Sequence, residues 1–124
     1  MVNKRLRYEL GLEAESITSH YLISIGYIIL HKRWKSKYGE IDIVAKSHDT
    51  ILFVEVKAKK ESRYEQEMVS MRQRKRNSKA ALDFLGQSDI NESLNIRFDC
   101  AIVTNKKIAH YIENAWYIEN EVYR

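Results

Sequence analysis

Residues 39–57 read GEIDIVAKSHDTILFVEVK, and this stretch decides the fold. Two apolar, β-branched runs flank the turn-forming residues 47–50. This pattern predicts an antiparallel hairpin with strands over residues 40–46 and 51–58. The register of that hairpin determines which charged residues are predicted to face each other.

In this register Asp42 lies opposite Glu55, and Glu40 lies opposite Lys57. Directly opposed side chains share one face of the sheet, with Cβ atoms roughly 5 Å apart. Two opposed carboxylates repel each other, so the pair favours a compensating cation. Mg²⁺ suits this role because it is usually held by one or two carboxylates together with waters and phosphate oxygens.

Lys57 lies on the same strand face as Glu55, because side chains alternate along a strand. Two roles are open to it. Its ammonium group can stabilise charge on a phosphate beside a metal, or it can pair with Glu40. A third interpretation is that all these charges only keep one strand face soluble. Apolar residues near the turn of the same face argue against that, because they indicate a pocket at the edge of a core.

Length and composition indicate one globular domain over residues 1–124, since 44% of the residues are hydrophobic and 31% are charged. Cys100 is the only cysteine, which excludes an internal disulfide. The first residues lack the apolar segment of a secretion signal, and the nearly apolar stretch 21–30 is too short to span a bilayer. We therefore expect a cytoplasmic protein with no membrane partner.

The charge distribution predicts a nucleic acid partner. Net charge is +4, and 13 of the 21 Lys and Arg residues fall within residues 32–37, 57–63 and 72–79. Basic runs beside an acidic pocket are typical of proteins that bind a phosphate backbone. The candidate contacts are Lys35, Lys37, Lys59, Lys60 and Arg72, together with Gln73.

The elements are predicted in the order α-β-β-β-α-β-β, which indicates an α/β fold with a mixed sheet of about five strands flanked by helices. Gly26 and Gly86 are predicted to end the two helices. The helices are expected over residues 4–25 and 65–85, and the strands over residues 27–34, 40–46, 51–58, 96–104 and 108–111.

Three polar positions need an explanation. On the first helix the apolar spacing predicts an inward stripe centred on Ala14, and Glu15 falls at its margin, where an exposed acid is the simplest interpretation. The predicted stripe is Leu6, Leu10, Ala14, Ile17, Tyr21 and Ile25. On the second helix, Gln73 and Asn77 fall on the inward stripe and need partners. Gln73 is predicted either to bond site groups or a phosphate, or to pack at the border of the apolar face. Asp99, in an apolar strand, is expected to be structural, with Arg97 as one partner.

Several motifs resemble the bacterial YraN family, in the right order over nearly the whole chain. That family is assigned to the PD-(D/E)XK, restriction-endonuclease-like superfamily and is similar in fold to archaeal Holliday-junction resolvases. The motifs are Gly11-Leu12-Glu13-Ala14-Glu15, Gly26-Tyr27-Ile28-Ile29-Leu30, Gly39-Glu40-Ile41-Asp42-Ile43-Val44-Ala45, Phe53-Val54-Glu55-Val56-Lys57 and Arg97-Phe98-Asp99.

The resemblance implies a role for each matching position. Glu15, Asp42 and Glu55 would hold one or two Mg²⁺ or Mn²⁺ ions, and Lys57 would assist catalysis. Two positions depart from the family pattern. Gln73 stands where a lysine is common, and Lys59 stands where arginine is common, which keeps the charge but loses the planar fork.

These observations predict a Mg²⁺-dependent endonuclease that hydrolyses DNA, with duplex and branched or otherwise structured DNA as candidate substrates. Two alternatives belong to other classes. One is a nucleic-acid-binding module that does not cut, and the other is an interaction factor in DNA repair or uptake. A homodimer is compatible with each of these predicted functions.

Overall fold

The computed structural model describes residues 3–60, 69–90 and 93–118. Five strands form one sheet in the order β1-β2-β3-β4-β5. The β3–β4 pair is parallel and the other three pairs are antiparallel, so the sheet is mixed. The elements are α1 (Lys4–Ser24), β1 (Ile28–Ser36), β2 (Gly39–Lys46), β3 (Thr50–Ala58), α2 (Met71–Gln87), β4 (Asn95–Thr104) and β5 (Lys107–Trp116). The predicted order and fold class are confirmed.

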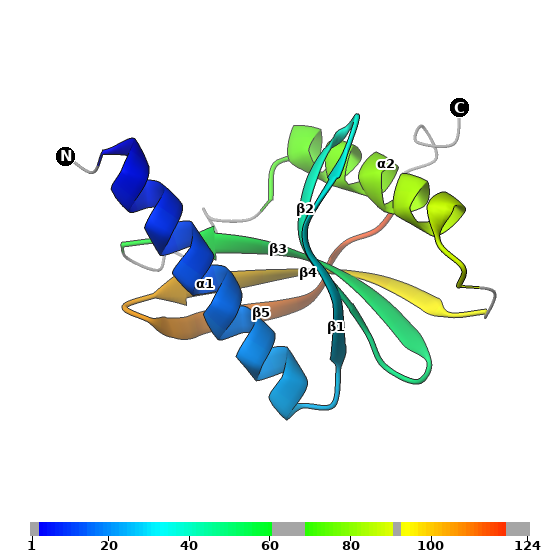
Figure 1. Ribbon diagram of the computed structural model, residues 1–124, viewed down its shortest axis with the longest axis horizontal. Helices are drawn as coiled ribbons and strands as arrows, with labels where there is room; N and C mark the ends of the chain where they lie inside the picture. Colours follow the sequence, from blue (N-terminus) through cyan, green and yellow to red (C-terminus); the bar gives the residue numbers. More distant parts are fainter. Residues whose placement is uncertain (1–2, 61–68, 91–92, 119–124) are drawn as a thin grey trace.

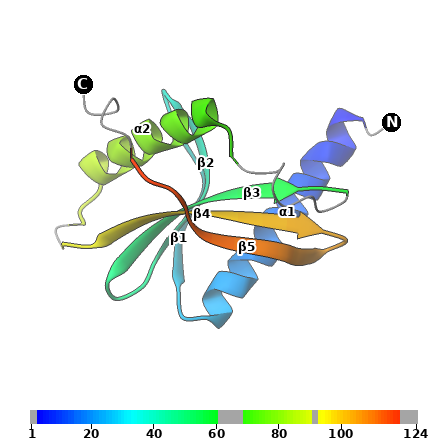
Figure 2. The ribbon, with the colours of Figure 1, turned by 180° about the vertical axis from the view of Figure 1, so that it is seen from behind.

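Helix α1 crosses one face of the sheet and α2 lies over the other (Figure 1). Seen from behind, the C-terminal end of β3 lies beside the matching end of β4 (Figure 2). Because β3 and β4 run in parallel, the chain between them has to cross over a face of the sheet, and α2 lies on this crossover. The start of α2 is thereby placed on the face to which Glu55 points.

Both boundaries of the second helix differ from the prediction. This helix was expected from about residue 65, but Val69 and Ser70 are not helical and α2 begins at Met71; residues 65–68 lie outside the described residues. The Ser70 side chain caps this helix by accepting a hydrogen bond from the Gln73 backbone N–H. The expected stop at Gly86 is also wrong, since the helix runs to Gln87.

The last strand is longer than predicted. β5 extends to Trp116, which pairs with Phe98 on β4. Asn114 in β5 has a φ of 51° and lies at a shift in register, which hides the strand period in the sequence. The β4–β5 turn was placed correctly, and Asn105 and Lys106 both have positive φ there, as a two-residue hairpin turn requires.

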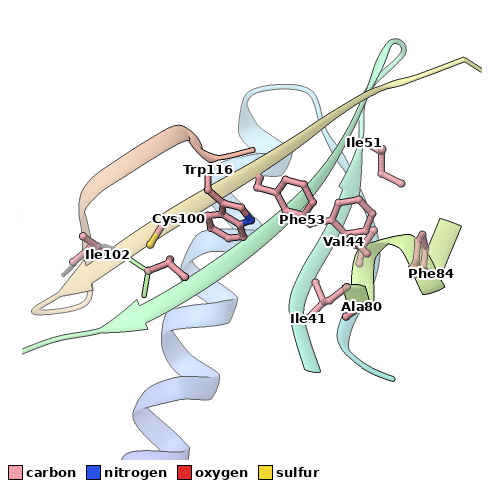
Figure 3. Packing of buried hydrophobic residues seen from close by; sticks show 12 residues of the cluster. Ile41, Val44, Ile51, Phe53, Ala80, Phe84, Cys100, Ile102 and Trp116 are labelled. Carbon is pink, nitrogen blue, oxygen red and sulfur yellow. The ribbon is translucent and has the colours of Figure 1, made fainter. Parts of the chain in front are cut away.

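The core on the α2 side is rich in aromatic rings (Figure 3). Phe98 stacks between Phe53 and Trp116, with ring centroids 5.6 and 5.1 Å apart. Phe84 from α2 meets Phe53 and Trp34 edge to face. These contacts hold α2 against the sheet and fix the positions of the polar residues on its first two turns.

On the other face, α1 buries a different stripe from the predicted one. Leu6 and Leu10 were expected to be apolar contacts, but each is more than 40% exposed. Ala14 is buried as predicted, but its buried neighbours on the helix are Thr18 and Leu22, which the predicted stripe did not contain. The apolar spacing alone could not show that the first turns of this helix make no buried contact with the sheet. The buried arc is therefore rotated toward Glu15.

Strand β2 changes its facing between Ile41 and Ile43. Ile43 packs on the α1 side, whereas Ile41 packs on the α2 side. In a regular strand residues two apart share a face. On the neighbouring strand β1, Arg33 lies opposite Asp42 and has a φ of 56°. The rotation places Asp42 at a local irregularity of the sheet.

Among the described helices, none is long and apolar enough to cross a membrane.

Candidate active site

The ladder between β2 and β3 ends just before the two predicted site acids. Its last pair joins Ile43 to Val54, and the predicted register is confirmed up to that point. Asp42 and Glu55 are the next residues of the two strands. Asp42 Oδ2 accepts a hydrogen bond of 2.8 Å from the backbone N–H of Val56. The carboxylate therefore takes the place of a ladder partner where the strands separate.

Two side-chain amides from α2 hold the carboxylate of Glu55, which is only 7% exposed. Gln73 Nε2 donates to Oε1 at 2.7 Å, and Asn77 Nδ2 donates to Oε2 at 2.9 Å. These bonds give Gln73 and Asn77 the partners that polar residues on the inward stripe of α2 need. An ionised carboxylate has about four acceptor positions, so these two donors leave acceptor capacity unused.

Lys57 belongs to the same hydrogen-bonded group. Its Nζ donates to Gln73 Oε1 at 2.9 Å and lies 3.9 Å from Glu55 Oε1. The predicted juxtaposition with Glu40 is wrong, because β2 and β3 separate before they reach these two residues. Glu40 instead forms an ion pair of 3.4 Å with Arg33. The ammonium group of Lys57 is consequently directed toward the buried acid.

Arg33 is a site residue that the sequence did not reveal. Its Nε lies 3.7 Å from Glu15 Oε1, and its Nη1 donates to the hydroxyl of Tyr8 at 3.0 Å. The side chain of Glu15 is only 12% exposed, so it is not the surface acid that the helix pattern alone suggested. The single sequence signal for Arg33 was its position in a basic run, because its contacts depend on an unusual φ.

Burial is the main cause of the raised pKa of the acids. It raises the pKa of Asp42 to about 8, with Glu55 as the second contributor. Burial also raises the pKa of Glu55, against the lowering effect of Asn77 and Lys57. The pKa of Glu15 is raised by burial too, although Arg33 lowers it. The site therefore favours either a proton or an added cation at neutral pH.

The donor set fits a hard divalent ion with few protein ligands. Within the described ranges, no three His, Cys, Asp or Glu side chains converge as a ready-made cage. Mg²⁺ does not need one, because it is usually bound by one or two carboxylates and keeps several waters. Asp42 and Glu55 supply such a pair. Glu15 is held on Arg33 and adds to the negative field at Asp42.

The predicted basic contacts are exposed. Lys59 and Lys60 follow directly after β3, and Arg72 precedes Gln73 at the start of α2. Lys35 and Lys37 lie at the end of β1 and in the turn that follows it. Along the chain, Lys59, Lys60 and Arg72 therefore lie within three residues of Lys57 or Gln73, whereas Lys35 and Lys37 belong to the β1–β2 hairpin.

Asp99 has the structural role that was expected. It is fully buried and accepts hydrogen bonds from the Arg97 guanidinium at 2.9–3.2 Å. The Tyr111 hydroxyl and the Asn114 backbone N–H complete its partners. These bonds join β4 to the irregular part of β5.

A hollow of about 350 Å³ lies elsewhere, between β1 and the C-terminal end of α2. None of the predicted site residues lines it. The lining residues are Leu30, His31, Trp34, Phe84, Gln87, Ser88, Asp89 and Ile90. The acids lie instead at the N-terminal end of the same helix, where Gln73 and Asn77 reach Glu55.

A five-stranded mixed sheet with a helix on each face, in the order α-β-β-β-α-β-β, makes this a protein of the restriction-endonuclease-like class. The chain belongs to the uncharacterised protein family UPF0102, the YraN family, whose sequence profile matches residues 14–103. The family is part of the restriction-endonuclease-like superfamily, so the resemblance in the motifs is confirmed.

Relatives match over most of their length. The UPF0102 protein of Thermodesulfovibrio yellowstonii is 35% identical over 111 residues, which cover 90% of this chain and 98% of that protein. A relative from a Sulfurihydrogenibium species is 38% identical over 101 residues, covering 80% and 86%. The protein of Nitrobacter winogradskyi is 34% identical over 109 residues, covering 88% and 92%.

Proposed function

We propose that this protein is a divalent-metal-dependent endonuclease that hydrolyses phosphodiester bonds in DNA, with Asp42 and Glu55 as metal ligands. One observation carries the proposal. Two acids lie together at the point where β2 and β3 separate, and burial and mutual repulsion raise the pKa of Asp42 to about 8. An arrangement that keeps two neighbouring buried carboxylates at such an electrostatic cost is expected to bind a cation.

Hydrolysis would add a water oxygen to phosphorus and break one P–O ester bond, with a proton passing to the leaving oxygen. A bound Mg²⁺ or Mn²⁺ ion would lower the pKa of water and neutralise phosphate charge. Lys57 would stabilise charge on the phosphate. Gln73 would orient the ammonium group of Lys57 by accepting its hydrogen bond. Asn77 and Gln73 would keep Glu55 in place. Glu15 would contribute negative field, or serve as a further ligand once released from Arg33.

A second candidate is a nucleic-acid-binding module that does not cut. The observation that favours this binding module is that the site acids already have ion-pair or hydrogen-bond partners within the protein. Arg33 pairs with both Glu15 and Glu40, and each oxygen of Glu55 accepts a hydrogen bond from an amide. A site that is satisfied in this way is stable without an ion. The exposed basic residues would then serve binding alone.

A cleavage panel separates the two candidates. The purified protein would be incubated with linear duplex, single-stranded and four-way-junction DNA in the presence of Mg²⁺, Mn²⁺ or a chelator. The endonuclease proposal predicts metal-dependent cutting of at least one substrate, and at least a hundredfold loss in Asp42→Asn, Glu55→Gln and Lys57→Ala, since each removes a charge needed in the transition state.

The control for charge removal is Glu13→Gln, because Glu13 is exposed on the same helix as Glu15. This variant should cut like the wild type. Circular dichroism would establish that each variant is folded. Cutting that persists in Asp42→Asn would identify a contaminating nuclease and refute the proposal, whereas DNA binding with no cutting of any substrate would favour the binding module.

A further inference from the structure

The turn between β1 and β2, residues 36–39, places an aromatic ring between two cations. The Nζ atom of Lys37 lies 5.2 Å from the ring centroid of Tyr38, and that of Lys79 lies 5.9 Å from it. Both distances fall within the usual range of a cation–π contact. Lys79 belongs to α2, so this ring connects the hairpin tip to the helix. We call residues 36–39 the hairpin tip.

The hairpin tip has a defined conformation. Ser36 Oγ accepts a hydrogen bond from the Tyr38 backbone N–H at 3.0 Å and donates to the Gly39 carbonyl oxygen at 3.1 Å. Gly39 has a φ of 144°, which favours glycine. Tyr38 nevertheless remains 37% exposed. The tip therefore has a defined backbone and an accessible ring, and the ammonium groups of Lys37 and of Lys79 on α2 lie beside this ring.

Lys79 also ends a row of exposed cations on α2. Arg72, Arg76 and Lys79 are spaced four and three residues apart, so they lie along one face of the helix. We call these three residues the basic row. At a rise of 1.5 Å per residue the row spans about 10 Å. Within the described part of the chain, no carboxylate forms an ion pair with any of them.

The basic row passes beside the acidic site. Arg76 is close enough to Glu55 to lower the pKa of that carboxyl group. Asn77, the next residue of the helix, bonds Glu55 directly. In Figure 1 the hairpin tip lies next to α2, the helix that carries the basic row.

Cations at this density that have no ion pair with a described carboxylate repel one another, and an anion placed between them relieves the repulsion. A nucleic acid strand supplies such anions at regular spacing. One strand of a duplex carries a charge about every 3.4 Å along the axis and winds around that axis, so a straight row of cations about 10 Å long faces the neighbouring phosphates that lie on its side of the duplex. A ring flanked by cations is also suited to contact sugar and base edges of the same strand.

We propose that the hairpin tip and the basic row together form a clamp for the phosphate backbone of a DNA strand that passes the acidic site. Lys37 and Lys79 bind phosphate oxygens, and the ring of Tyr38 holds their ammonium groups in place. The orientation of the strand toward Glu55 rests on the proposed nuclease function. The binding itself does not.

The test measures DNA affinity by fluorescence anisotropy in a chelator, so that neither metal binding nor cleavage contributes. The probes are a labelled duplex and a labelled single strand of the same sequence. Lys37→Ala and Lys79→Ala should each weaken binding several-fold and reduce the slope of log affinity against log salt by about 1. Tyr38→Leu should weaken binding although it removes no charge, whereas Tyr38→Phe, which keeps the ring, should bind like the wild type.

The matched control is Lys4→Ala. Lys4 is exposed at the start of α1, which covers the opposite face of the sheet from α2, and its loss changes the net charge by the same amount. Equal weakening by Lys4→Ala and Lys79→Ala would show that only overall charge matters and would overturn the clamp. Wild-type affinity in Tyr38→Leu would overturn the role of the ring.

The outcome is separable from that of the nuclease proposal. Loss of binding in the tip and row variants, in a protein that cuts no DNA with any metal, would support the clamp and refute the nuclease. Metal-dependent cutting by a protein whose tip and row variants bind normally would support the nuclease and overturn the clamp.

Discussion

At the scale of single residues, Gln73 connects the two charged groups on which the proposed chemistry depends. Its amide oxygen accepts from Lys57 and its amide nitrogen donates to Glu55. One side chain thereby satisfies a buried acid and orients a cation. A lysine at this position could donate to Glu55, but it could not accept from Lys57.

Replacement of Gln73 by alanine should both destabilise the protein and lower any cleavage. The change leaves one oxygen of Glu55 with a missing donor in a buried position, at a cost of about 1–2 kcal/mol in unfolding free energy. Urea denaturation measures that cost. Gln87→Ala is the control on the same helix, because Gln87 is exposed, and it should shift the stability by no more than about 0.5 kcal/mol. Equal effects of the two changes would contradict the bridging role.

At the scale of elements, the site forms where the β2–β3 ladder ends and the backbone of β1 and β2 is irregular. Strand β2 rotates between Ile41 and Ile43, and Arg33 has a positive φ on the facing strand. The rotation frees Asp42 to bond the backbone of β3. Arg33, from the same irregular position, reaches Glu15 on α1. Local backbone irregularity therefore brings residues from four elements, α1 and β1 to β3, to one place.

Two substitutions at Arg33 should separate its backbone strain from its charge. Arg33→Ala and Arg33→Gly both remove the guanidinium, but only glycine adopts a φ of 56° without a Cβ penalty. We expect the alanine variant to be less stable than the glycine variant by about 0.5–1 kcal/mol in equilibrium unfolding. An alanine variant as stable as the glycine variant would show that the position is not strained.

The same two variants should bind metal more tightly than the wild type. Without the guanidinium, Glu15 loses the cation that lowers its pKa, and the negative field at Asp42 is no longer partly neutralised. Calorimetric titration with Mg²⁺ measures this. Unchanged affinity in both variants would mean that Arg33 does not compete with the ion.

At the scale of the whole molecule, regular parts of the fold could be predicted from the sequence and irregular parts could not. The hairpin register up to Ile43 and Val54, which brings Asp42 and Glu55 near each other, follows from strand alternation and a recognisable turn. Gln73 and Asn77 were identified because a buried stripe has to satisfy its polar members. The burial of Glu15 could not be inferred from apolar spacing, because that spacing favoured a stripe containing Leu6, which the structure leaves exposed.

The contacts of Arg33 depend on one backbone dihedral angle, for which no residue pattern gives a signal. The start of α2 was misplaced for a different reason. Residues before Ser70 read as helical on composition, whereas the capping hydrogen bond of Ser70 sets the beginning of the helix. Competition between a cap and a propensity is decided by the three-dimensional surroundings.

Thermal stability without metal should fall as the pH rises between 3.8 and about 8, the ordinary and the folded-state pKa of Asp42. Over this range the folded protein holds a proton that the unfolded chain has released, so each rise in pH favours unfolding. Glu15 and Glu55 act in the same direction, since burial raises the pKa of both. Asp42→Asn, which removes this titration, should show a flatter profile.

Added Mg²⁺ should counter this loss. The ion competes with the proton for the same carboxylates, so its stabilisation of the folded state should be larger above the pKa of Asp42 than well below it. Differential scanning calorimetry of wild type and Asp42→Asn measures the effect as a change in Tm. Each protein is scanned with and without Mg²⁺, at one pH above the pKa of Asp42 and at one pH well below it. The Asn variant should gain little at either pH. An equal gain in Tm at both pH values in the wild type, or the same gain in the Asn variant, would show that Mg²⁺ does not bind at these acids.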